Sequence, residues 1–384
     1  MDVHALSVIV FLTILGFLVY KDRKNIEFKY FLLLRRTKFG IKLLDKMSKP
    51  KKIWKIFATI GIAIAFFLMF EGFYSLIAYG KLLIEGVAKL PGLSFVIPSI
   101  KSEVEVGKGY LLLPFWFWVI IVISVIVPHE GLHGIMCRTE NVKVKSAGFL
   151  LLLILPGAFV EPDEKQLRKA KLISKLRIFV AGSVANFLVY LFVYALTSYI
   201  IWPYLVPGPI ELKEVNATGP AAQAGLKPGM YVTEINGKPV KLTYTEFLSG
   251  SRYLAEETAN LKPGDEITIK ANNTEFKLKL ASNPENASLP YMGIVYSPVT
   301  RGNTNMNFLL QLLTWMWIIN YAVAIFNILP LYPLDGGMVV RAIAEKISKK
   351  NADGITYFIS FLTISILLFN FVFPLLSQVT LQPS

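Results

Sequence analysis

The sequence predicts a polytopic α-helical membrane protein with about six transmembrane helices, a re-entrant loop or hairpin, and one inserted small α+β domain. The 384-residue chain is 54% hydrophobic, and its mean hydropathy of +0.52 exceeds that of ordinary soluble proteins. Its apolar residues gather in runs long enough to cross a bilayer. Segment 203–303 differs, because its charges balance and its sequence alternates as strands do.

Six apolar runs have the composition of membrane-spanning helices. They occupy residues 3–20, 53–78, 110–136, 177–202, 307–331 and 355–376. The first run lacks a basic segment before it and a small-residue cleavage site after it, so we expect a retained helix rather than a cleaved signal peptide. Tryptophans in or near the expected interfaces agree with these boundaries.

Basic residues set the expected orientation. Segment 21–55 carries thirteen lysines and arginines against three acidic residues. Nucleic-acid binding is one interpretation, but between two spans such a segment is typical of a cytoplasmic loop on anionic lipid. Segment 137–176 is expected on the same side, and 80–109 and 203–303 outside. We therefore expect a multi-pass protein of the cell membrane, in contact with the lipid bilayer and without a nucleic-acid partner.

The third run contains His129, Glu130 and His133 in the order His-Glu-x-x-His. On a helix, histidines four residues apart share one face and can bind one metal ion, and the glutamate can take a proton from metal-bound water. The alternative is a pair of interface histidines. Ionisable residues at membrane depth are costly and usually mark function, which favours the metal site. Cys137 is the only cysteine, which excludes an intrachain disulfide and a cysteine-rich zinc site.

A catalytic zinc usually has three protein ligands and a water molecule. Asp335, in the sequence Pro-Leu-Asp-Gly-Gly, lies at the expected cytoplasmic end of the fifth run. This position is level with the two histidines in the expected topology. The alternative is that Asp335 caps a helix or forms an Asp-Gly turn.

An apolar stretch between the third and fourth runs, 148–160, is too short to cross a bilayer. Gly148 precedes its centre, and Pro156 and Gly157 follow it. A re-entrant loop or hairpin directed towards the metal site is one interpretation. An apolar loop on the surface is equally consistent with the sequence.

Three motifs together resemble the site-2 protease family of intramembrane zinc metalloproteases. The first is His-Glu-x-x-His, and the second is Asn-x-x-Pro-x-x-x-Leu-Asp-Gly at 327–336. The third, Ala-Gly-Ser-Val-Ala-Asn at 181–186, is similar to the family's Ala-Gly-Pro-x-x-Asn, with Ser183 where proline is usual. The resemblance covers residues 110–350 in order.

The resemblance implies a zinc endopeptidase with one catalytic Zn²⁺. It implies that His129, His133 and Asp335 are the zinc ligands and that Glu130 is the catalytic acid and base. The predicted substrate-binding residues are Asn327, Asn186 and Gly148. Asn186 has an equal alternative as a buried asparagine that joins two membrane helices.

The sequence of residues 215–240 is similar to the PDZ modules of this family. Gly-Pro-Ala at 219–221 and Ile-Asn-Gly at 235–237 stand in the expected places, whereas Met230 replaces the usual aspartate. A PDZ-like domain binds an extended peptide or a C-terminus by strand addition. We expect it to gate substrate entry, and a lid that only blocks access is the alternative. All three Asn-x-Ser/Thr sites of the chain fall within segment 203–303, which agrees with an outer location: Asn216, Asn272 and Asn286.

Four regions follow. Residues 1–109 hold two spans with the basic loop and an outer segment, 110–202 the first half of the catalytic membrane core, 203–303 the extracytoplasmic PDZ-like domain, and 304–384 the second half of the core. The expected function is regulated intramembrane proteolysis of single-pass membrane proteins, with the active site near the cytoplasmic face. Two alternatives stand beside it: a zinc protease with its site in a cytosolic or lumenal chamber, and a membrane PDZ scaffold or transporter with a degenerate site. No inverted repeat favours a transporter.

Overall fold

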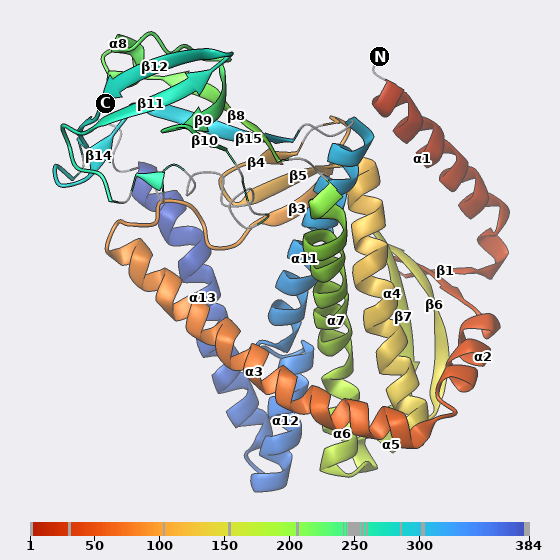
Figure 1. Cartoon of the computed structure of the whole chain (residues 1–384). Coiled ribbons are helices and arrows are strands. Elements are labelled where there is room, and N and C mark those ends of the chain that lie inside the picture. The colour runs from red at the N-terminus through yellow and green to blue at the C-terminus, as the bar shows by residue number, and fades with distance from the viewer. Residues whose placement is uncertain are drawn as a thin grey trace. The chain divides into compact units, whose positions relative to one another are not determined.

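A computed structural model (Figure 1) describes residues 3–29, 32–102, 104–152, 155–204, 207–240, 242, 244, 254, 257–258, 260–284, 286–300 and 304–379. The chain divides into two compact units. The first comprises Met1–Val193 and Trp315–Ser384, and the second comprises Tyr194–Thr314.

Six helices in the described part of the chain are long and apolar enough to cross a membrane. They are His4–Lys21, Lys51–Ile84, Phe115–Thr139, Ala181–Ile201, Phe308–Ile328 and Ala352–Leu376. Large apolar side chains on them face outwards, among them Phe70 at 71% and Phe361 at 65% exposure. A bilayer accommodates such surfaces, whereas a water-exposed protein rarely carries contiguous apolar patches of this extent. The predicted polytopic helical class is confirmed.

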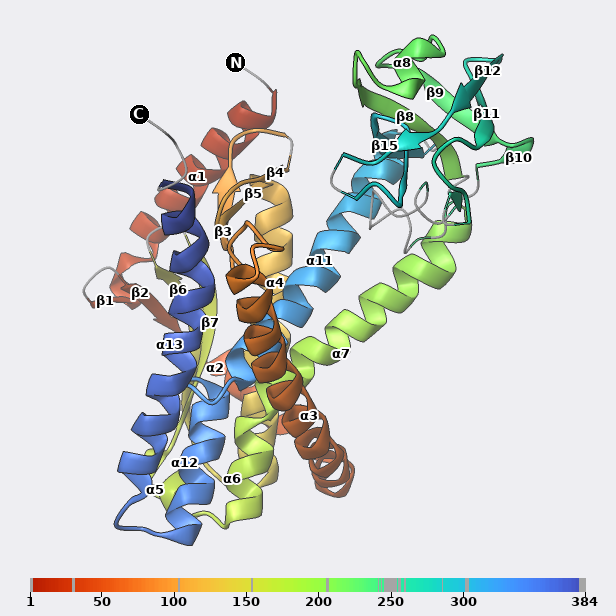
Figure 2. The same cartoon turned by 90° about the vertical axis from the view of Figure 1, so that its left-hand side faces the viewer.

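The first unit contains most of the helices, in whole or in part. Their bounds are α1 (Val3–Lys21), α2 (Lys38–Met47), α3 (Lys51–Ile84), α4 (Phe115–Thr139), α5 (Glu164–Lys169), α6 (Leu172–Phe179), α7 (Ala181–Ala195), α11 (Thr304–Ile328), α12 (Asp335–Ile347) and α13 (Ala352–Val379). Figures 1 and 2 show α12 beside α13, and α4 beside a long β-hairpin. Buried Ala65, Ala324 and Ala342 lie in one apolar cluster of this unit. Such small side chains allow the helices that carry them to pack closely.

Two predicted spans begin later than the sequence indicated. Residues 110–114 form a strand, β5 (Tyr110–Pro114), in a small sheet with β3 (Phe95–Ser99) and β4 (Glu105–Val106). The helix starts only after Pro114, which has a fixed φ and no N–H and therefore suits the junction. The fourth span starts at Ala181, because the chain between α6 and α7 is interrupted at Val180.

The apolar stretch 148–160 lies in an antiparallel hairpin of β6 (Val144–Leu152) and β7 (Leu155–Pro162). A second hairpin, β1 (Ile26–Lys29) and β2 (Leu32–Arg36), extends it to a four-stranded sheet in the order β1-β2-β6-β7. The hairpin interpretation is confirmed, and its depth in the membrane stays a prediction. The basic segment 21–55 is thus partly a sheet rather than a plain loop.

Gly148 lies in the interior strand β6, opposite Phe159 of β7 and Arg36 of β2. A side-chain carbon at Gly148 would overlap the carbonyl oxygen of Arg35. This close approach of the β2 backbone explains why position 148 holds a glycine. It favours a packing role for Gly148 over the predicted contact with substrate.

The second unit is a small α+β domain, as predicted. Its main strands are β8 (Pro207–Val215), β9 (Tyr231–Ile235), β11 (Glu266–Ala271), β12 (Thr274–Lys279) and β15 (Ile294–Thr300), in the order β12-β11-β9-β8-β15. The minor strands and the short helix are β10 (Lys238–Pro239), β13 (Ala281–Ser282), β14 (Pro290–Tyr291) and α8 (Pro220–Gln223). Ile210, Leu212, Ile267 and Ile269 form its buried centre.

Candidate metal centre

Helix α4 places His129 and His133 one turn apart on the same face. Their Nε2 atoms lie 3.3 Å apart, and both side chains are largely buried, at 13% and 17% exposure. The two histidines therefore share one helix face, as the sequence predicted, and their Nε2 atoms point towards the same place.

Asp335 completes a group of three. Its Oδ2 atom lies 3.5 Å from Nε2 of His129, and its Oδ1 atom lies 3.3 Å from Nε2 of His133. Asp335 is the first residue of α12, and the residue before it, Leu334, occupies the N-cap position without a side-chain hydrogen bond. Asp335 is therefore not the N-cap residue of α12, which was one of the roles that the sequence allowed.

The three side chains fit a zinc ion. With bonds of about 2.0–2.1 Å, the ligand atoms of a tetrahedral zinc site lie about 3.4 Å apart. The two Nε2 atoms lie 3.3 Å apart, and the Oδ1 and Oδ2 atoms of Asp335 lie 3.3 and 3.5 Å from one Nε2 each, so the three side chains converge at about this spacing. Nδ1 of His133 lies 2.7 Å from the carbonyl oxygen of Ile178. Because a carbonyl only accepts, Nδ1 carries the hydrogen and Nε2 keeps its lone pair for a metal.

Helix α7 contributes two residues that were not among the predicted site residues. A side-chain carbon at Gly182 would meet the Nε2 atoms of both histidines, so only glycine lets α7 come this close. Ser183 is fully buried, and its hydroxyl donates to Oδ2 of Asp335 at 3.2 Å. Both residues belong to the Ala-Gly-Ser-Val-Ala-Asn motif, which could have marked them as site residues. That α7 packs against α4 cannot be inferred from any local sequence pattern.

The turn that precedes α12 holds Asp335 in place. A side-chain carbon at Gly336 would overlap the carbonyl oxygens of Ile328 and Leu329, and one at Gly337 would overlap the backbone of Tyr332. The two glycines therefore let the start of α12 pack directly on the end of α11. This explains why Gly-Gly follows the aspartate.

Glu130 is tied to the hairpin. Its Oε2 atom accepts a hydrogen bond from the backbone N–H of Val160 at 3.1 Å. Val160 belongs to β7, the outermost strand of its sheet on that side. The carboxylate beside the histidines is thus held against the edge of β7 that pairs with no other described strand.

The other two predicted substrate-binding residues differ in their surroundings. Asn186 is fully buried on α7, and both its amide nitrogen and its amide oxygen lack a partner among the described residues. It follows Ser183 by three residues and Gly182 by four, so it shares their helix face. The absence of an interhelical bond counts against the alternative that Asn186 joins two helices. Asn327 is half-buried in the last turn of α11.

Comparison with known proteins agrees with this geometry. The family model described as peptidase family M50 matches residues 116–369. An uncharacterized protein of Methanocaldococcus jannaschii is 31% identical over 344 residues, which cover 88% of this chain and 85% of that protein. The zinc metalloprotease RasP of Geobacillus kaustophilus is 23% identical over 286 residues, covering 60% of this chain and 65% of RasP.

A solved PDZ domain of an SdrC-like protein from Listeria monocytogenes matches 23% of this chain and 87% of that domain, with 22% identity and a TM-score of 0.19. The family match spans both histidines and Asp335. The chain therefore belongs to peptidase family M50, the site-2 protease family, and is a multi-pass membrane metalloprotease.

Proposed function

We propose that this chain is an intramembrane zinc endopeptidase with one catalytic zinc held by His129, His133 and Asp335. The observation that carries the proposal is that two Nε2 atoms 3.3 Å apart converge with the Asp335 carboxylate, whose Oδ1 and Oδ2 atoms lie 3.3 and 3.5 Å from one Nε2 each, on helices of the membrane-spanning unit. When bound, zinc supplies Lewis acidity that activates water near neutral pH and stabilises negative charge on the substrate carbonyl. The same intact ligand set argues against a scaffold or a transporter with a degenerate site.

Glu130 is the proposed acid and base. It takes a proton from the attacking water and delivers it to the leaving amine, which splits the peptide bond. The N–H of Val160 keeps one carboxylate oxygen of Glu130 oriented, at 3.1 Å. The other oxygen stays available for the proton.

A substrate helix has to unwind before its carbonyls can react, because helical hydrogen bonds occupy them. Strand β7 offers replacement partners. It pairs with β6 along one edge, while its Val160 N–H points to the other edge, towards Glu130. Pro156 and Pro162 have no N–H, so strand addition is confined to residues 157–161. We propose that an extended substrate segment pairs there.

The amide of Asn186 is proposed to hold the substrate backbone. Its donor and acceptor are both buried without a partner among the residues that the structure describes, which is costly unless a ligand satisfies them. Asn327 is proposed to act similarly from α11.

Several features of the whole chain remain part of the proposal. The substrates are single-pass membrane proteins, and the process is regulated intramembrane proteolysis in the cell membrane. The site lies near the cytoplasmic face, and the PDZ-like unit lies outside and gates entry by binding a peptide or a C-terminus. The excess of basic residues in 21–55 supports this orientation.

The test uses purified full-length Glu130→Gln. We expect this variant to retain bound zinc and to lose at least about 100-fold in cleavage of a single-span substrate, since general acid-base groups contribute this much. Zinc is measured by atomic absorption and cleavage by gel electrophoresis. Wild-type rates of cleavage by the variant would refute the assignment.

A further inference from the structure

A polar pocket of ≈ 500 Å³ lies where α2, α3, α4 and α5 come together, apart from the metal centre. Four cationic side chains, Lys49, Lys51, Arg138 and Lys143, line it together with a single carboxylate, Asp45. The pocket therefore carries a net positive charge, which attracts anions.

Most of this charge is uncompensated. Asp45 is engaged by Arg138, with Nε 2.9 Å from Oδ1. Lys51 donates to the neutral amide oxygen of Asn141 at 2.6 Å, so its charge is not cancelled. Among the described residues, neither Lys49 nor Lys143 forms an ion pair through its ammonium group.

The walls of the pocket are fixed by hydrogen bonds. Gln166 accepts from the backbone N–H of Lys143 at 2.8 Å. The N–H of Gln166 in turn donates to Asp163 at 3.0 Å, which caps α5 and holds the pKa of the Asp163 carboxyl below its ordinary value. These hydrogen bonds hold Lys143 and the start of α5 together at one side of the pocket.

The pocket lies at the ends of two membrane spans. Helix α3 begins at Lys51 and α4 ends at Thr139. Apolar side chains become exposed within two turns of this point, with Ile53 at 67% and Ile56 at 65%. Helix α2 also exposes Leu43 and Met47 beside its lysines, as helices lying in a membrane interface do.

We propose that this pocket binds the phosphate group of an anionic phospholipid, whose acyl chains lie against the exposed apolar side chains of α2 and α3. Lysines and arginine at the end of a span are suited to such headgroups. The lipid would also support the metal-bearing helix, because buried Leu44 of α2 fills the space above Gly134, the residue after His133. This inference does not depend on the proposed protease activity.

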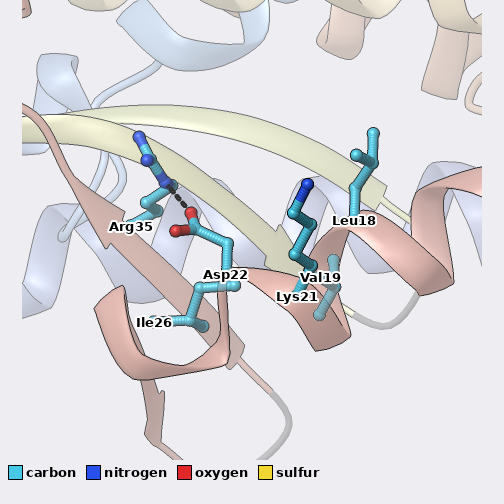
Figure 3. Close-up of a pocket in the computed structure, with 6 residues that line it drawn as sticks. All are labelled: Leu18, Val19, Lys21, Asp22, Ile26 and Arg35. Atoms are coloured by element: carbon cyan, nitrogen blue, oxygen red, sulfur yellow. Dashed lines mark hydrogen bonds and ion pairs between the residues drawn. The ribbon is translucent and has the colours of Figure 1, made fainter.

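A pocket at the end of α1 differs in charge. It is lined by Leu18, Val19, Lys21, Asp22, Ile26 and Arg35 (Figure 3). Arg35 is bound to Asp22 there, which leaves Lys21 as the lining cation without an ion pair among the described residues. It therefore lacks the cluster of cations that a phosphate needs.

The test compares thermal unfolding of the full-length protein in neutral detergent with added phosphatidylglycerol, phosphatidylcholine or inorganic phosphate. We expect phosphatidylglycerol alone to raise the midpoint, by about 2 °C or more at saturating lipid. Lys49→Gln/Lys143→Gln should lose this rise. Lys349→Gln/Lys350→Gln, which removes two exposed lysines between α12 and α13, should keep it.

Native mass spectrometry of the same samples supplies a second measurement: the wild type should retain phosphatidylglycerol, and the pocket variant should release it. An equal rise with inorganic phosphate would assign the pocket to a free phosphate and overturn the lipid source. A rise that the pocket variant keeps, or that the control variant loses equally, would overturn the site. Both variants should cleave substrate normally in neutral detergent.

Discussion

At the scale of single residues, the ligands and the residues around them differ in how far the sequence predicts them. His129, Glu130 and His133 lie in one turn, so helical geometry alone brings them together. Asp335 lies far along the chain, and the family resemblance was needed to select it over a helix cap. Gly182 and Ser183 lie in the recognised 181–186 motif, but their roles could not be predicted because these arise from the contact of α7 with α4 and α12.

Gly182→Ala should lose most of its bound zinc, because the added methyl group meets Nε2 of both histidines. Gly131→Ala is the matched control, since it lies within the same motif and its added methyl group would meet no atom within 4 Å. Zinc content of the two purified variants checks this. Full zinc in Gly182→Ala would show that α7 does not pack against the histidines as described.

Ser183→Ala should lower zinc affinity by about 10-fold, the usual effect of removing a group that orients a metal ligand. The hydroxyl bonds to Asp335 at 3.2 Å and fixes the carboxylate. Competition with a chelator measures the affinity. Ser365→Ala, which removes a hydroxyl bonded within its own helix α13, should leave it unchanged. Equal affinities in the wild type and Ser183→Ala would contradict the orienting role.

At the scale of elements, the β6–β7 hairpin could be predicted from the sequence, but the pairing of β2 with it could not. Gly148, Pro156 and Gly157 indicated a loop or hairpin because these residues interrupt a short apolar run. The pairing of β2 with β6 was hidden, since the basic charge of 21–55 dominated that segment and strand pairing between distant segments leaves no local signal. For the same reason 110–114 was predicted as helix although it pairs as strand β5.

Val160→Pro should abolish substrate cleavage while zinc stays bound. Proline removes the N–H that orients Glu130, but leaves the ligands on α4 and α12 intact. Val160→Ala keeps the N–H and should cleave nearly normally. Paired measurements of zinc content and cleavage separate the two variants. Full cleavage by Val160→Pro would contradict the role of the Val160 N–H in orienting Glu130.

At the scale of the whole molecule, composition was sufficient to predict a membrane protein. Each of the six predicted apolar runs overlaps a span-length helix, because length and hydropathy largely decide which segments leave water. The boundaries of the inserted domain and the side of the membrane on which it lies rest on charge patterns, and both remain predictions.

Cysteine labelling can test the predicted orientation, because Cys137 is buried and no other cysteine is present. In a Cys137→Ala chain, Lys350→Cys between α12 and α13 should react with a membrane-impermeant maleimide only after the membrane is opened. Lys277→Cys in β12 should react in intact cells. The opposite pattern would reverse the assignment of the two faces.

The central claim is that His129, His133 and Asp335 together hold one catalytic zinc. The most direct measurement is the zinc content of purified Asp335→Ala beside the wild type and Asp353→Ala, which removes an exposed carboxylate that pairs with Arg341. The account predicts one zinc per chain in the wild type and in Asp353→Ala, and little or none in Asp335→Ala. Undiminished zinc in Asp335→Ala would contradict it.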